Sequence, residues 1–158
     1  DVKWSYKGIG EPAGYQFRTY DMNTVKKHLD NSTYKALLAQ YASRDNKGDD
    51  YGKVGDNVVY INVWNYDPAW TVRWYENGEP RGEMTQYTNY DESIYDYMAR
   101  FSDRFKHKNI GSDLTEHLFY AVPSSPDAVV RIEVRDRFGN ISAWNNVSGH
   151  EKANDSNK

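Results

Sequence analysis

The stretch VVYINVWNYDPAWTVRWYENG, residues 58–78, contains two apolar runs with turn residues between and after them. In the first run, 58–64, Val59, Ile61 and Val63 alternate with a second set of side chains that is also largely apolar. Side chains along a strand point alternately to its two faces, so both faces of this segment are expected to be buried. The run therefore predicts a strand in the interior of a sheet.

The second run, 70–75, predicts the first strand of a hairpin, with Val72 between two tryptophans on one face. Asn77-Gly78 follows almost at once. This pair accepts the two positive φ angles of a type I′ turn, which joins antiparallel strands by two residues. The chain is therefore expected to return as an antiparallel strand over 83–87.

Outside this stretch, alternation and turn residues mark further strands, and periodic apolar residues mark two helices. The clearest strand is 129–135, where Val130, Ile132 and Val134 should face inward and the charged residues between them outward. The other expected strands are 15–20, 116–122 and 141–144, and the expected helices are 31–42 and 91–105. The sequence therefore predicts a mainly β domain, an antiparallel, Ig-like β-sandwich with one or two inserted helices. This domain is expected to span 1–148, and the polar tail, 149–158, is expected to be disordered.

Composition and charge narrow the function classes. The 158 residues carry a net charge of -3, so the chain lacks the excess of positive charge that is typical of a nucleic-acid-binding domain. No apolar stretch reaches the roughly 18 residues that span a bilayer, so no membrane span is expected. The sequence contains no cysteine, which excludes thiol catalysis, disulfides and thiolate metal sites.

Catalytic motifs are also absent from the sequence. Two-metal hydrolysis requires clustered aspartate, histidine and asparagine ligands that hold the ions about 4 Å apart. The four histidines, none of which lies in such a block, are His28, His107, His117 and His150. No serine nucleophile elbow, phosphate-binding loop or dinucleotide motif occurs. The sequence therefore predicts no catalytic residue, no metal site and no cofactor in this chain.

Aromatic residues make up 15% of the chain, and two uses for them are open. They can fill a core, because aromatic rings bury large areas, or they can form an exposed stacking surface for sugars. Core packing is expected for Trp70 and Trp74, which share a strand face. Trp64 and Tyr66 border the turn at Pro68 and are the candidates for exposure. A glycan-binding module built on these two rings is the alternative function.

Several motifs, taken in order, resemble a known family. They are WSYKG (4–8), GYQFRTY (14–20), INVWNYDP (61–68), WTVRWYENG (70–78), GEM (82–84), TEHLF (115–119) and VRDRFGN (134–140). These long aromatic motifs resemble the C-terminal domain that follows the catalytic domain in calcineurin-like metallophosphoesterases of Bacteroidetes. The region Asn31–Asp56 departs from the pattern as an insertion of unassigned role.

The resemblance implies a non-catalytic accessory domain that packs against the phosphoesterase domain of the same polypeptide. It implies that the parent protein binds two divalent metal ions and is exported, to the periplasm or the cell surface. In such a parent, residues 4–20 would follow directly on the catalytic domain. Trp4, Tyr6 and Tyr15 are therefore the aromatic residues expected to lie at the interface between the two domains.

Overall fold

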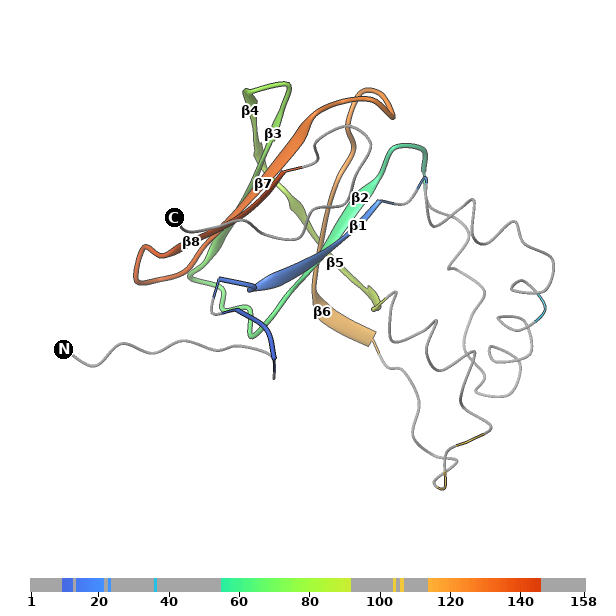
Figure 1. Ribbon diagram of the computed structural model, residues 1–158, viewed down its shortest axis with the longest axis vertical. Coiled ribbons are helices and arrows are strands. Elements are labelled where there is room, and N and C mark those ends of the chain that lie inside the picture. Colours follow the sequence, from blue (N-terminus) through green and yellow to red (C-terminus); the bar gives the residue numbers. More distant parts are fainter. Residues whose placement is uncertain are drawn as a thin grey trace.

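The computed structural model describes residues 10–12, 14–21, 23, 36, 55–91, 104, 106 and 114–145. Within these residues the chain is mainly β, as predicted, with strands β1 to β8 in two antiparallel four-stranded sheets (Figure 1). The Ig-like arrangement stays a prediction. Both predicted helices, 31–42 and 91–105, fall almost entirely outside the described residues, as does the whole tail. Across the described part of the chain, no helix combines the length and apolarity that a membrane crossing needs.

The first sheet has the strand order β1-β2-β6-β5 and is built around the strand predicted from residues 58–64. In β2, Ile61 lies opposite Thr19 of β1 on one side and opposite Phe119 of β6 on the other. β2 therefore has a hydrogen-bonded partner along both edges, which confirms its interior position. The bounds of the four strands are β1 Phe17–Asp21, β2 Val59–Val63, β6 Leu114–Ala121 and β5 Thr85–Tyr90.

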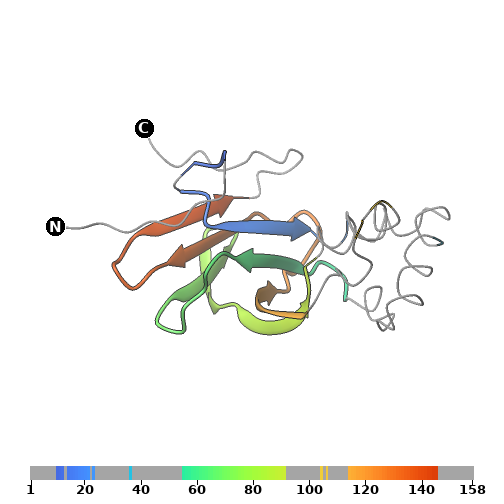
Figure 2. The same cartoon turned by 90° about the horizontal axis from the view of Figure 1, so that it is seen from below.

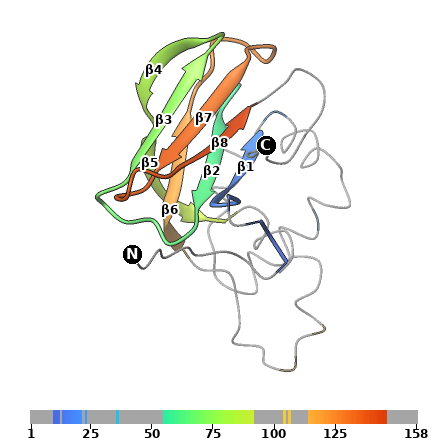
Figure 3. The same cartoon turned by 60° about the vertical axis from the view of Figure 1, so that its left-hand side comes forward.

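The second sheet has the strand order β4-β3-β7-β8 and is seen face-on in Figure 3. Asn77 and Gly78 join β3 to β4 with φ angles of 52° and 88°, so both turn residues are left-handed, as a type I′ turn requires. The predicted hairpin turn is therefore confirmed. The bounds of the four strands are β4 Glu79–Glu83, β3 Thr71–Glu76, β7 Val130–Arg135 and β8 Ile141–Asn145.

The predicted return strand, 83–87, is wrong because the chain changes sheets within it. β4 pairs with β3 only up to Glu83, and β5 begins at Thr85 in the other sheet, opposite Tyr120. Met84 lies between the two strands with 6% of its surface exposed and belongs to the core cluster. The chain therefore crosses from one sheet to the other at the buried Met84. The predicted strand 83–87 is divided between the end of β4 and the start of β5.

One hydrophobic core is shared by the two sheets. Val59, Ile61 and Val63 of β2 meet the predicted inward residues of β7 in this core, together with residues of β1, β3 and β6. Burying an aliphatic side chain stabilises the fold by roughly 1.5–3 kcal/mol, so these residues account for much of the attraction between the sheets. Trp70 and Trp74 are partly buried and pack against the core, which confirms the structural use predicted for them.

Candidate interaction surfaces

Three segments lie at the end of the domain where β1 begins (Figure 2), and a contact joins the first to the second and the second to the third. They are residues 10–12 and 14–16 before β1, the β2–β3 loop over 64–70, and the β7–β8 turn over 136–140. The backbone N–H of Trp64 donates to the carbonyl of Gln16 at 2.9 Å, which joins the first two segments. We call the surface formed by these three segments the Phe138 end, after its most exposed large side chain.

The Trp64 ring contacts Tyr15, just before β1, and Arg18, within β1. The Tyr15 ring lies 6.2 Å from the Trp64 ring, centroid to centroid, in a tilted arrangement. The guanidinium carbon of Arg18 lies 5.6 Å from the Trp64 centroid, within cation–π range. Trp64 is partly buried, so much of its face is already used by the chain itself.

Tyr66, the second ring of the alternative glycan surface, is also partly buried. It meets Phe119 edge-on at 4.8 Å and packs against the core. Two rings on a strand face would need to be open and coplanar to stack on a sugar, and Trp64 and Tyr66 are each less than half exposed. The geometry of these residues therefore does not favour the glycan function. Trp4 and Tyr6 lie outside the described residues, and the interface role of Tyr15 stays a prediction.

An ion pair ties the β2–β3 loop to the β7–β8 turn. One carboxylate oxygen of Asp67 accepts the backbone N–H of Ala69 at 2.8 Å, and the other accepts a hydrogen bond from the Arg137 guanidinium. The Arg137 contact holds the pKa of Asp67 below its usual value. The two residues lie 70 positions apart in the chain, so the sequence motifs that contain them did not reveal the pair.

The β7–β8 turn is held by Asp136 and presents Phe138 to solvent. The Asp136 carboxylate accepts the backbone N–H groups of Phe138 and Asn140, each at 2.8 Å. Phe138 is 71% exposed. An aromatic residue beside Gly139 is the one signal in the sequence that could have indicated a surface site here.

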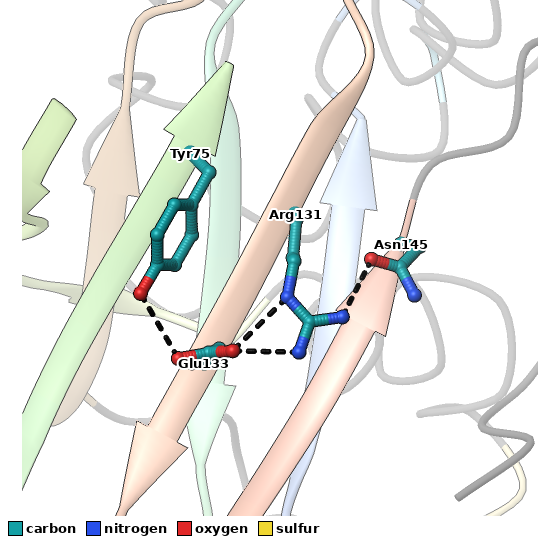
Figure 4. Close-up of polar contacts among 4 residues, drawn as sticks. All are labelled: Tyr75, Arg131, Glu133 and Asn145. Atoms are coloured by element: carbon teal, nitrogen blue, oxygen red, sulfur yellow. Dashed lines mark hydrogen bonds and ion pairs between the residues drawn. The ribbon is translucent and has the colours of Figure 1, made fainter. Parts of the chain in front are cut away.

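The outer face of the second sheet carries a polar ladder across three strands (Figure 4). Glu133 of β7 accepts the Tyr75 hydroxyl at 3.1 Å and two guanidinium N–H groups of Arg131, at 2.6 and 3.0 Å. Arg131 also donates to the side chain of Asn145 at 3.2 Å. The Arg131 contacts, reinforced by Tyr75, hold the pKa of Glu133 below its usual value despite partial burial. Two of the outward charged residues predicted for 129–135, Arg131 and Glu133, therefore form an ion pair with each other.

The outer face of the first sheet carries a tyrosine cluster instead. Tyr60, Tyr87 and Tyr120, from β2, β5 and β6, lie with their ring centroids 5.4 to 6.0 Å apart. Burial, together with the neighbouring Tyr87 and Tyr120, raises the pKa of Tyr60 to about 12. Leu118 of β6 lies on the same face of the sheet as Tyr60 of β2 and is 3% exposed. This face is therefore already covered over part of its area.

Two further carboxylates are buried, and the chain supplies donors to both. Asp91 accepts the Tyr20 hydroxyl at 3.0 and 3.1 Å from its two oxygens, and the side-chain amide of Asn62 at 2.7 Å. Glu76 accepts hydrogen bonds from Ser124 and forms an ion pair with Arg81. Across the residues described here, histidine and carboxylate side chains form no group of three that could hold a metal ion. These acids join strands and loops.

Comparison with known proteins assigns the chain to a family. The family model described as the C terminal of Calcineurin-like phosphoesterase matches residues 1–141. The match spans both sheets as far as the first residue of β8, and it includes the region 31–56. No curated protein and no solved structure matches the chain. The chain therefore belongs to the family of C-terminal domains of calcineurin-like phosphoesterases.

Proposed function

We propose that this chain is a non-catalytic accessory domain of a metal-dependent phosphoesterase and packs against the catalytic domain of the same polypeptide. The observation that carries the proposal is the family match over residues 1–141, which assigns the chain to the C-terminal part of a calcineurin-like phosphoesterase. The fold supplies a stable core of its own, so its surface is available for an interdomain contact.

The chemistry of the described carboxylates supports a structural role. Hydrolysis of a phosphate ester by two metal ions needs carboxylates whose oxygens point at the ions. The oxygens of Glu76, Asp91 and Glu133 instead accept hydrogen bonds from serine, tyrosine, asparagine and arginine. These three acids therefore serve to connect elements of the fold.

The catalytic part of the proposal is tested by assay of the purified 158-residue chain. Aryl phosphate monoesters and diesters would be supplied with Mn²⁺, Zn²⁺ or Fe²⁺, and the longer polypeptide that contains this chain serves as the positive control. We expect turnover by the longer polypeptide alone, with two divalent ions bound in its catalytic domain. Metal-dependent turnover that follows the 158-residue chain through purification would overturn the proposal.

The packing part is tested by hydrogen exchange. Backbone amides near Trp4, Tyr6 and Tyr15 are expected to exchange more slowly in the longer polypeptide than in the isolated chain, because the catalytic domain would cover them. Limited proteolysis over 4–20 gives an independent measure of the same protection. Equal exchange and equal cleavage in both proteins would contradict a contact at these aromatic residues.

The proposal includes export to the periplasm or the cell surface in a member of the Bacteroidetes. Both points are supported by the resemblance of the aromatic motifs to that group of phosphoesterases. Fractionation of the source cells, with an antibody raised against the 158-residue chain, tests the location. Recovery of the protein in the cytosolic fraction would contradict it.

A further inference from the structure

We infer that the phosphoesterase domain docks on the Phe138 end and that the ring of Phe138 is the anchor of this contact. The inference rests on the proposed function, since it names the surface through which the accessory domain would meet its catalytic partner. It adds residues of the β2–β3 loop and the β7–β8 turn to the aromatic segment that the sequence pointed to.

The β7–β8 hairpin exposes two large apolar side chains to solvent. Phe138 is 71% exposed and Ile141, the first residue of β8, is 45% exposed. A phenyl ring in water at the tip of a turn contributes nothing to the core of its own domain. Aromatic residues, phenylalanine among them, are, however, enriched in interfaces relative to the rest of a protein surface. The turn holds the backbone of Phe138 in place, because Asp136 accepts its N–H, so little order would be lost on docking.

Charged side chains lie beside Phe138 at the Phe138 end. Arg137 and Asp67 flank the apolar tip as an ion pair, and their side chains stay 51% and 34% exposed. An aromatic centre with a polar rim is the usual composition of an interface between domains of one chain, which is more polar than an obligate interface. The Phe138 end therefore has the character expected for this kind of partner.

Residues 14–16, which lead into β1, lie beside the β2–β3 loop. Tyr15 contacts Trp64, and the carbonyl of Gln16 accepts the N–H of Trp64, so this segment is fastened to the Phe138 end (Figure 2). In a C-terminal domain of a phosphoesterase, the catalytic domain comes earlier in the polypeptide. A domain tethered through this segment is held at high effective concentration near the surface to which the segment is fastened.

The other described surfaces are less suited to the contact. The outer face of the first sheet already buries Leu118, and the ladder on the second sheet satisfies its own charges around Glu133. The strongest competitor is the opposite end, where Val122 is 53% exposed and Val129 is 46% exposed. Ala121 pairs with Val59, the first residue of β2, so Val122 lies far along the sheet from the loop that follows the last residue of β2.

The experiment compares hydrogen exchange in the longer polypeptide and in the 158-residue chain, each as wild type, Phe138→Ser and Val122→Ser. Val122→Ser is the matched control, because it removes an exposed apolar side chain from the opposite end. In the wild type, we expect amides of 64–70 and 136–140 to exchange roughly tenfold more slowly in the longer polypeptide. Phe138→Ser should abolish that difference, and Val122→Ser should leave it unchanged.

Two results would overturn the inference in distinguishable ways. Protection confined to 122–129, or removed equally by both variants, would leave the packing proposal standing and place the interface elsewhere. Exchange that is the same in both proteins over every described strand and loop would contradict interdomain packing itself. The wild-type comparison decides between these outcomes even if a variant folds poorly.

Discussion

Ser124 donates both its backbone N–H and its hydroxyl to the same carboxylate oxygen of Glu76, each at 2.6 Å. Arg81 approaches the other oxygen at 2.7 Å, and the Glu76 side chain is 2% exposed. Glu76 ends β3, Arg81 lies in β4 and Ser124 lies in the loop after β6, so one carboxylate joins both sheets. The two Ser124 hydrogen bonds, with help from Arg81, hold the pKa of Glu76 below its usual value.

Replacement of this carboxylate is expected to weaken the fold. Glu76→Gln retains the shape of the side chain but places an NH2 group, which cannot accept a hydrogen bond, against either Arg81 or the two Ser124 donors, so the thermal midpoint should fall by about 5 °C. Glu79→Gln, on the exposed edge strand β4, is the matched control and should change the midpoint little. Equal midpoints for the two variants, measured by circular dichroism, would contradict the role given to Glu76.

The same carboxylate should make stability depend on acid. Since its native pKa is lowered, the folded state favours the ionised form, and this contribution is fully present above the ordinary value of 4.5. It is lost as the pH falls from 4.5 through the lower native pKa. The difference in thermal midpoint between wild type and Glu76→Gln should therefore shrink on acidification below pH 4.5. A difference that stays constant over that range would show that ionisation of Glu76 does not stabilise the fold.

Tyr60 should make stability depend on alkali. Its pKa is raised from 10.0 to about 12, so the folded state favours the neutral phenol. The contribution is fully present below pH 10.0 and is lost as the pH rises toward 12. Tyr60→Phe has no proton to lose and should flatten the fall of the thermal midpoint in this window. Tyr75→Phe, on the other sheet, is the control. The same slope for wild type and Tyr60→Phe would contradict the shift.

The type I′ turn requires a residue that tolerates a positive φ angle. Gly78 has a φ of 88°, and a Cβ added there would meet no atom within 4 Å, so any cost of Gly78→Ala comes from the backbone alone. That cost is expected to be about 1–2 kcal/mol in the free energy of unfolding. Gly55→Ala is the control, because a Cβ at Gly55 would make only an ordinary contact of 3.6 Å with Val58. Urea unfolding of both variants measures the difference.

The shared core should be sensitive to the loss of a single methyl-bearing side chain. Ile132 has no exposed surface and lies in the cluster that both sheets share, so Ile132→Ala is expected to cost about 2–5 kcal/mol. Ile141→Ala removes the same atoms from a site that is 45% exposed and should cost much less. Similar urea midpoints for the two variants would mean that the sheets do not depend on this core.

Local patterns in the sequence were sufficient for most of the strands. The alternation in 58–64 and 129–135 identified β2 and β7, because each strand has one face of β-branched residues that cannot remain in water. Asn77-Gly78 identified the hairpin turn, since few other pairs accept its backbone angles. The order of the aromatic motifs identified the family, which the match over residues 1–141 confirms.

What the sequence determined by itself was therefore local: which residues form strands, which side chains face a core, and where the tightest turn lies. Only the tertiary structure decided that Met84 carries the chain from one sheet to the other, that Asp67 pairs with Arg137 across 70 residues, and that Phe138 is left in solvent. The physical reason is that the spacing of apolar residues shows which face of a strand is buried, but not which other segment packs against that face. The partner is set by hydrogen bonds and packing between segments far apart in the chain, which no local window contains.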